Sequence, residues 1–259
     1  MINNKIIYLS TPTTVDMADE WYEFALLDHF WIQGRFKSLL KLKIIKNLTN
    51  VRLLEIGCGN GVNIKQFETL SDVVVDGCDL NLVALKKVDR NKGSLFLLDI
   101  FDKPPELLQK YDGTLLMDVI EHIHDDSRFL NCALEYLKEN GLVIINVPAF
   151  QFLFSKYDTV NGHKRRYTKN RILDLFKKNN IELIHIGYWG FLLIPILIMR
   201  KFILFFQSNN TAIKKGFQPP LKVVNWFLNQ IINFENLVFP SSPFGTSIIA
   251  IGKKNHKEL

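Results

Sequence analysis

Short apolar runs alternate with amphipathic segments through the middle of the chain. Six runs have the length and composition of buried strands, at 51–56, 73–78, 94–98, 113–117, 141–147 and 181–186. Segments with helical spacing of apolar residues lie between them, at 61–70, 81–89, 104–110, 126–138 and 168–179. Alternating strands and helices form βαβ units, whose right-handed crossovers place helices on both faces of a parallel sheet. With a last strand at 246–251, the pattern predicts an α/β fold with a doubly wound, mostly parallel sheet of seven strands.

Aromatic residues dominate the helical pattern that precedes the first of these strands. Trp21, Phe30 and Trp31 recur at helical spacing within residues 16–48, and Gly34 is a candidate break between two helices. An aromatic stripe of this kind fits either a lid over a ligand site or plain core. We therefore expect N-terminal helices outside the sheet, and both roles stay open.

A long insertion at 190–244 interrupts the alternation before the last strand. Pro195, Arg200 and Lys201 break its apolar run, so no stretch reaches the ~20 apolar residues that span a bilayer. Three alternatives stay open for this insertion. It walls an apolar substrate pocket, pairs with a second subunit as a homodimer, or makes peripheral contact with a membrane.

Charge differs among the four parts into which these elements divide the chain. We expect an N-terminal helical cap at 1–50, a Rossmann-like core at 51–189, the helical insertion at 190–244, and the last core strand and tail at 245–259. The last two parts carry the whole net charge of +6, with 8 Lys and Arg against 2 Asp and Glu. This surplus favours an anionic partner, such as a lipid surface or a phosphorylated substrate, or else forms a solvated face.

Cysteine usage and the start of the chain bear on location and metal chemistry. Cys58, Cys78 and Cys132 form no Cys-x-x-Cys pair, which argues against a zinc or redox site and fits a reducing cytosol. The first residues lack the apolar core of a signal peptide. We therefore expect a cytoplasmic location and no metal site. Peripheral contact with the inner face of the membrane stays an alternative.

A glycine-rich turn after the first predicted strand is the strongest chemical signal in the chain. The strand Val51–Ile56 leads into Gly57, Gly59 and Gly61, and a helical pattern follows. Glycine lets a ligand approach the backbone closely, and ligands of open α/β sheets lie at the carboxyl ends of the strands. The dinucleotide fingerprint requires a third glycine where this chain has Val62, and no Gly-Lys-Ser/Thr ending marks a phosphate loop.

The segment Glu55-Ile-Gly-Cys-Gly-Asn-Gly61 resembles the first motif, E/D-x-G-x-G-x-G, of the class I S-adenosylmethionine-dependent methyltransferases. Landmarks of that family also end the next three strands, at Asp79, at Asp99 and from Asp118 to His122. The resemblance covers roughly residues 20–189 and 243–252. It implies S-adenosyl-L-methionine as cofactor, held by Glu55, Gly57, Cys58, Gly59, Gly61, Asp79, Leu80, Asp99, Ile100 and Asp118.

Three acidic residues of this set have structural alternatives. The resemblance implies that Asp79 accepts hydrogen bonds from the ribose hydroxyls and that Asp99 contacts the adenine amine. Alternatively, Asp79 is the N-cap of the following helix, and Asp99 shares a turn with Asp102. Glu55 either contacts the ligand or only caps the glycine turn.

Two further segments resemble a bacterial branch of the same family, one near the N-terminus and one after the fifth strand. The first, Leu27-Asp-His29-Phe-Trp31 followed by Arg35, implies that His29 and Arg35 belong to the cofactor site. The second spans Tyr157 to Tyr167 and implies substrate binding by Arg165, Arg166 and Tyr167. Alternatively, His29 fills core beside its aromatic neighbours, and the second segment is a solvated basic turn.

The implied reaction is transfer of a methyl group by direct displacement, with oxygen favoured over nitrogen or carbon as the acceptor atom. His122 and His163 are the candidate general bases, because histidine titrates near neutral pH and both should lie at the carboxyl edge of the sheet. The alternative for His122 is a supporting contact to the cofactor site. The acceptor is expected to be a small molecule, a glycan or lipid-like, and the apolar, basic insertion favours a lipid-like or otherwise anionic apolar acceptor over a small polar one.

Two other functions remain in competition. One is an NAD(P)-dependent oxidoreductase, against which Val62 counts, and the other is a catalytically silent cofactor-binding or membrane-adaptor protein. Nucleic acid is not expected as a partner. The basic surplus is interleaved with aliphatic residues, and no Asn-Pro-Pro-Tyr motif ends the fourth strand.

Overall fold

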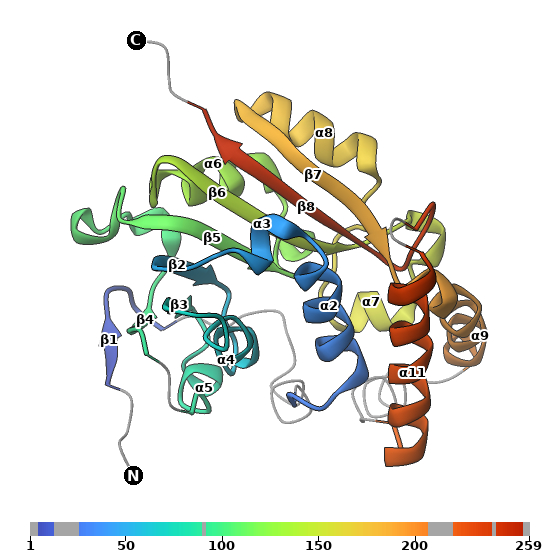
Figure 1. Cartoon of the computed structure of the whole chain (residues 1–259). Helices are drawn as coiled ribbons and strands as arrows, with labels where there is room; N and C mark the ends of the chain where they lie inside the picture. The colour runs from blue at the N-terminus through green and yellow to red at the C-terminus, as the bar shows by residue number, and fades with distance from the viewer. Residues whose placement is uncertain (1–4, 13–25, 90–91, 207–219, 240–241, 256–259) are drawn as a thin grey trace.

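An eight-stranded mixed sheet runs through the centre of the computed structural model (Figure 1). The structure describes residues 5–12, 26–89, 92–206, 220–239 and 242–255. The strands are β1 (Ile6–Tyr8), β2 (Val51–Ile56), β3 (Val73–Asp79), β4 (Leu95–Leu97), β5 (Tyr111–Met117), β6 (Leu137–Pro148), β7 (Ile181–Trp189) and β8 (Ser247–Lys254). Their order is β1-β4-β3-β2-β5-β6-β8-β7. β8 is antiparallel to both of its neighbours, and the other pairings are parallel.

The predicted α/β fold is confirmed, and all seven predicted strands are present. The apolar pattern missed β1, which pairs with β4 and places Ile6 opposite Leu95. This strand has three residues, and its burial falls from half-buried at Ile6 to exposed at Tyr8, so it lacks the buried run that marks the others.

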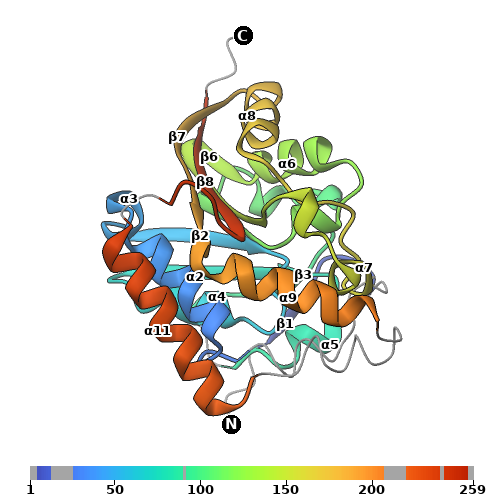
Figure 2. The same ribbon diagram turned by 90° about the vertical axis from the view of Figure 1, so that its right-hand side faces the viewer.

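Helices cover both faces of the sheet, as the βαβ pattern predicts (Figures 1 and 2). One face carries α2 (Phe30–Leu40), α3 (Lys43–Lys46), α4 (Val62–Phe67) and α5 (Leu82–Leu85), and the other carries α6 (Asp126–Glu135) and α8 (Lys169–Lys178). At the carboxyl end of the parallel strands lie α7 (Lys156–Val160), α9 (Ile194–Phe205) and α11 (Lys222–Val238). Short 3-10 turns occupy Ile100–Asp102, Pro105–Leu107, Ile120–His122, Gln151–Leu153 and Phe191–Leu193.

Alternate residues of a strand enter different cores. Leu53 packs with the helices α2 to α5, whereas Leu54 and Ile56 pack with α6 and α8. Because both faces of the central strands are buried, these strands appear in the sequence as continuous apolar runs. Both faces of the sheet are therefore covered by helices, and its carboxyl edge is the place where a site can form.

Two helical predictions are wrong in detail. The segment 104–110 forms only the 3-10 turn Pro105–Leu107, because consecutive prolines cannot donate the hydrogen bonds of a longer helix. Gly34 does not separate two helices but lies inside α2. A Cβ on Gly34 would lie 2.6 Å from Cδ1 of Ile232, so the glycine permits close approach of α2 to α11. Residues 16–25 of the N-terminal pattern lie outside the described residues.

The insertion before the last strand is helical, as predicted, and it packs against the N-terminal helix. Leu193, Leu228 and Ile232 form a small buried cluster with Phe30 and Trp31 of α2 (Figure 2). Among the helices that the structure describes, none is both long and apolar enough to cross a membrane. The boundaries of the four parts stay predictions.

Candidate active site

A cavity of about 770 Å³ opens at the carboxyl ends of β2 to β5. The predicted site residues that line it are His29, Arg35, Gly57, Cys58, Gly59, Asp79, Leu80, Asp99, Ile100, Asp118, His122, His163 and Arg166. Four other predicted residues do not line it, namely Glu55, Gly61, Arg165 and Tyr167. Their positions are described below. The topology explains the gathering, since parallel strands end at one edge.

The glycine turn is fastened to the end of β3. Gly57, Gly59 and Gly61 have φ angles of 73°, 53° and 76°, which glycine adopts without strain. The Gly57 and Cys58 amides both donate to the Cys78 carbonyl, at 2.8 and 3.0 Å. Gly61 lies behind the cavity wall as the N-cap of α4, and a Cβ there would lie 2.7 Å from Cγ1 of Val88. Gly61 therefore shapes the turn, and its expected contact with the ligand stays a prediction.

Asp79 places a buried carboxylate beside this turn. Its Oδ2 accepts from the Gly59 amide at 2.8 Å, and its Oδ1 accepts from the Asn81 amide at 2.8 Å. Burial raises the pKa of Asp79, and the backbone amides around it oppose that shift. The N-cap of α5 is Asn81, whose side chain accepts from Val83 and Ala84, so the capping alternative for Asp79 is wrong. A carboxylate oxygen has two lone pairs, so each oxygen still has room to accept a hydroxyl.

The next strand adds an apolar and an acidic contribution. Leu80, Leu98 and Ile100 line the cavity with Asp99 between the last two. The Asp99 carboxylate caps the following 3-10 turn by accepting from the Phe101 amide at 3.0 Å. Apolar faces with one acidic edge suit a flat heteroaromatic ring that carries an amine.

A buried polar network connects the N-terminal helix to three strands. Arg35 of α2 donates to Asp118 Oδ2 at 2.5 Å and to the side-chain oxygen of Asn63. Asn63 donates in turn to Oε1 of Glu55 at 2.5 Å. On the other side, Asn146 donates to Asp118 Oδ1 at 2.5 Å. Arg35 therefore has a structural role, in which it holds Asp118 at the cavity, and its expected contact with the cofactor stays a prediction.

Glu55 lies beneath the glycine turn and does not line the cavity, and its expected contact with the ligand stays a prediction. It is fully buried, and its Oε2 has no hydrogen-bond partner within the described residues. Burial raises the pKa of Glu55 to about 8, although the hydrogen bond from Asn63 and the charge of Arg35 oppose that shift. Glu55 therefore acts on the site through Asn63.

His29 closes the cavity from the N-terminal side. Its ring accepts from the Trp31 amide at 3.2 Å, which makes it the N-cap of α2. Burial lowers the pKa of His29 to about 4, so the ring is neutral at physiological pH. Trp31 in turn packs against Trp189, with ring centroids 4.6 Å apart. His29 thus lines the cavity beside Phe30 and Trp31, and its expected contact with the cofactor stays a prediction.

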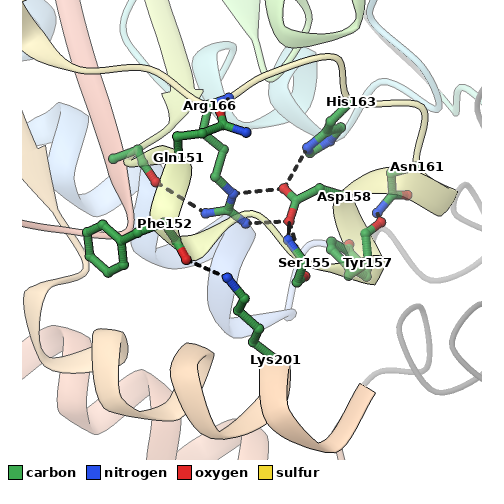
Figure 3. Close-up of polar contacts among 10 residues, drawn as sticks. Gln151, Phe152, Ser155, Tyr157, Asp158, Asn161, His163, Arg166 and Lys201 are labelled. Atoms are coloured by element: carbon green, nitrogen blue, oxygen red, sulfur yellow. Dashed lines mark hydrogen bonds and ion pairs between the residues drawn. The ribbon is translucent and has the colours of Figure 1, made fainter. Parts of the chain in front are cut away.

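The second predicted segment folds around a buried carboxylate, Asp158 (Figure 3). Arg166 donates to both Asp158 oxygens, at 2.8 and 3.0 Å, and His163 Nδ1 lies 3.0 Å from Oδ1. Burial alone would raise the pKa of Asp158, but His163 and Arg166 lower it to about 2. The guanidinium of Arg166 is thus engaged by Asp158, although the residue also lines the cavity, and its expected contact with a substrate stays a prediction.

Arg165 and Tyr167 do not line the cavity but fasten this segment to residues 120–124, and their expected contact with a substrate stays a prediction. Arg165 donates to the carbonyls of Ile123 and His124, each at 2.8 Å, and the fully buried Tyr167 places its hydroxyl 3.1 Å from the Ile120 carbonyl. Their effect is to bring His163 against His122, with ring centroids 4.7 Å apart.

Residues that the sequence analysis did not single out also line the cavity. Glu121 is fully buried, and its pKa is raised well above the ordinary value by burial and by the charge of Asp118. The guanidinium carbon of Arg200 in α9 lies over the ring of Tyr157 in α7, 4.0 Å from the ring centroid, and both residues line the cavity. Glu121 directly precedes the candidate base His122, so the sequence offered a signal that Glu121 belongs to the site. No feature of the sequence predicted the contact between Tyr157 and Arg200.

These features fit the cofactor that the sequence resemblance implies. The cavity offers Asp79 to a ribose diol, the strand end around Asp99 to adenine, and a glycine turn that leaves room at the backbone. A Cβ on Gly57 would lie 2.9 Å from Cγ2 of Val119, so the turn also needs glycine for its own packing. The residue roles themselves stay predictions.

Comparisons with known proteins give the same assignment. A family model described as a methyltransferase domain matches residues 28–186, more than half of the chain. The ubiquinone biosynthesis O-methyltransferase of Pelagibacter ubique is 28% identical over 205 residues, covering 64% of this chain and 81% of that protein. The protein of the same name from Bradyrhizobium sp. is 31% identical over 166 residues, covering 53% and 64%.

Solved structures share the fold. Phosphoethanolamine N-methyltransferase 2 of Haemonchus contortus, in complex with S-adenosyl-L-methionine, superposes with a TM-score of 0.56 at 17% identity. The superposition covers 87% of this chain but only 53% of that enzyme. An S-adenosylmethionine-dependent methyltransferase from Mesorhizobium loti gives 0.55 at 11% identity, covering 89% and 99%. From the family match and these folds, the chain belongs to the class I S-adenosylmethionine-dependent methyltransferases and uses S-adenosyl-L-methionine as its methyl donor.

Proposed function

We propose that this enzyme methylates a hydroxyl oxygen of a small acceptor that carries a lipid-like part. The observation that carries the proposal is the composition of the cavity wall formed by the insertion. Ile196 and Leu197 of α9 and Leu228 of α11 line the same cavity as Asp79, with Arg200 close by. An apolar wall beside a cation suits an amphipathic acceptor. Oxygen as the acceptor atom is supported by the names of the Pelagibacter and Bradyrhizobium relatives.

The residue roles follow from where each group lies. Asp79 accepts from the ribose, and the backbone of Gly57 and Gly59 lets the cofactor lie close to the turn. S-adenosylmethionine supplies a methyl group that is already activated on sulfur. The chain's contribution is alignment, which supplies up to roughly 7–11 kcal/mol, and activation of the acceptor hydroxyl beside His122 and His163.

A direct test compares two acceptors that differ only in the tail. One is a phenol with an isoprenoid chain and the other is the same phenol without it, and release of S-adenosylhomocysteine measures turnover. We expect a higher kcat/KM for the tailed phenol, and Leu197→Ser should reduce that preference. Ile203→Ser is the matched control, because Ile203 lies on the same helix but is half exposed and does not line the cavity. Equal kcat/KM for both phenols would refute a lipid-like acceptor.

We also propose that α9 and α11 contact an anionic membrane surface, where such an acceptor would reside. Large apolar side chains on these helices are exposed, including Phe202, Phe205, Trp226 and Leu237. The surplus of 8 basic over 2 acidic residues from 190 to the end of the chain favours a lipid surface over a second copy of an equally basic chain.

Sedimentation with vesicles tests the membrane contact. Binding to phosphatidylglycerol vesicles should exceed binding to phosphatidylcholine vesicles, and Phe202→Ser with Phe205→Ser should abolish it. Loss of a dimer in the double variant, with no vesicle binding by the original protein, would instead assign this surface to a homodimer.

A further inference from the structure

Three potential metal ligands meet at the acceptor side of the cavity. Glu121 and His122 belong to the 3-10 turn after β5, and His163 follows α7. Each offers one ligand atom, and the three atoms lie within 4.8 Å of one another. All three residues line the cavity. The Lys164 amide donates to the Glu121 carbonyl at 2.8 Å, so the two chain segments are fixed to each other by backbone.

Glu121 is the member of this cluster that needs explanation. Its side chain is fully buried, and in the part of the chain that the structure describes neither carboxylate oxygen has a hydrogen-bond partner. Buried charged groups in proteins are paired, hydrogen-bonded or bound to a metal. The neighbouring carboxylates Asp118 and Asp158 add further negative charge around it. A cation between Glu121 and the histidines would satisfy both oxygens.

His163 is oriented as a metal ligand usually is. Its Nδ1 lies 3.0 Å from Asp158, and this carboxylate is held by Arg166 (Figure 3). With Nδ1–H donating to Asp158, the lone pair resides on Nε2, which is the tautomer that ligates. A carboxylate behind the histidine is the common arrangement around metal sites, where it fixes the ring and raises its basicity.

We propose that Glu121, His122 and His163 bind one divalent transition-metal cation. Three atoms within 4.8 Å of one another share a point no more than about 2.8 Å from each, whereas metal–ligand distances are about 2.0–2.2 Å. Each atom would therefore move inward by less than about 1 Å. Two imidazoles and one carboxylate suit Zn²⁺, Fe²⁺, Co²⁺ or Mn²⁺ and leave positions open for substrate. This proposal replaces the expectation, from cysteine spacing, that the chain has no metal site.

The cation would act on the acceptor hydroxyl, and this step rests on the proposed function. A hydroxyl bound at an open position has its pKa lowered by the Lewis acid, so it loses its proton to solvent. The oxygen electron pair then forms the O–CH3 bond while the CH3–S bond breaks, and the sulfonium becomes a neutral thioether. The histidines would thus serve as ligands rather than as the proton acceptor itself.

The test measures cation binding without any acceptor. The purified enzyme is stripped with a chelator and titrated with Co²⁺ by calorimetry and by visible absorption, which reports its coordination. We expect one equivalent to bind. His163→Ala and Glu121→Gln should each weaken binding by at least about 100-fold, because outer partners of a metal site alone contribute 10–100-fold. His124→Ala is the matched control, since His124 is a neighbouring but exposed histidine that does not line the cavity.

Folding of each variant is checked by its affinity for S-adenosylhomocysteine, which should stay within a few-fold of the original. If Co²⁺ binding is absent, or equal in the original and the Glu121→Gln and His163→Ala proteins, the metal site is overturned. If one equivalent of Co²⁺ binds at this site but the enzyme methylates neither phenol, the metal site is supported and the proposed acceptor is refuted. If the enzyme binds no Co²⁺ at this site and still methylates the phenol after chelation, this inference is refuted and the proposed function stands.

Discussion

Removal of the Arg35 side chain should both destabilise the fold and weaken the methyl-donor site. Arg35 is 5% exposed, and its pairing with Asp118 and Asn63 ties α2 to the end of β5 and to the first turn of α4. Breaking a buried pair by removal of one partner costs about 3–5 kcal/mol. Asp118 retains 27% exposure, so water compensates part of the loss and we expect a value near 3 kcal/mol. With an m-value of about 3 kcal/mol/M, the urea midpoint of Arg35→Met should fall by about 1 M.

Two assays separate the consequences. Urea unfolding followed by circular dichroism gives the stability change, and calorimetry with S-adenosylhomocysteine gives the affinity. We expect an affinity loss of at least about tenfold, which is 1.4 kcal/mol, because Asp118 and Asn63 both line the cavity.

Two control substitutions bracket the result. Lys138→Met removes an exposed pair with Asp112, with side chains 50% and 31% exposed, and should cost less than about 1 kcal/mol. Arg52→Met leaves the fully buried Asp76 without its ion pair, so it should destabilise without changing the affinity. The reasoning is refuted if Arg35→Met is as stable as Lys138→Met, or if Arg52→Met weakens the cofactor as much as Arg35→Met does.

Three further outcomes are expected. Gly61→Ala should lower stability by about 1–3 kcal/mol in urea unfolding, since its φ is 76° and its Cβ would meet Val88; an unchanged midpoint would contradict this. Gly34→Ala should be destabilised by the contact of its Cβ with Cδ1 of Ile232. The double variant with Ile232→Val, which lacks that atom, should recover stability. Failure of this rescue would show that the contact between the two helices is not the cause. Burial lowers the pKa of His29 to about 4 in the folded protein, so the unfolded chain takes up the proton first as the pH falls. The free energy of unfolding should therefore decrease as the pH drops from about 6.5 towards 4, by up to about 3 kcal/mol. His29→Asn keeps a good N-cap and should lose this pH dependence, whereas an identical pH profile would refute the assignment.

The methyl-donor side could be predicted from sequence because its groups are local. Residues at the ends of the central strands face the cavity, since Asp79 ends β3 and Asp118 directly follows β5. A strand, a turn and a helix within a short stretch fix such positions without knowledge of distant contacts. The same locality explains why β8 was recognised as a strand, although its place between β6 and β7 needed the folded structure.

The acceptor side could not be predicted in the same way, because its geometry depends on long-range pairing. Two adjacent arginines were visible in sequence, but not that Arg166 pairs with Asp158 while Arg165 caps carbonyls of another segment. Glu121 and His163 are 42 positions apart and meet only because the segment after β6 folds back onto the turn after β5. Sequence spacing shows which groups exist there, and tertiary contacts decide which of them face the cavity.

The point at which the insertion leaves the sheet has a consequence for how this enzyme diversifies. β7 and β8 are neighbouring antiparallel strands, and Trp189 pairs directly with Ser247, so the whole insertion begins and ends at adjacent positions. Closing a longer or shorter connection between fixed ends changes the free energy of folding only slowly with length. Exchange of this connection is therefore expected to alter the proposed acceptor wall while leaving the strand register and the methyl-donor half unchanged. Donor and acceptor recognition would in that sense be separable in one chain.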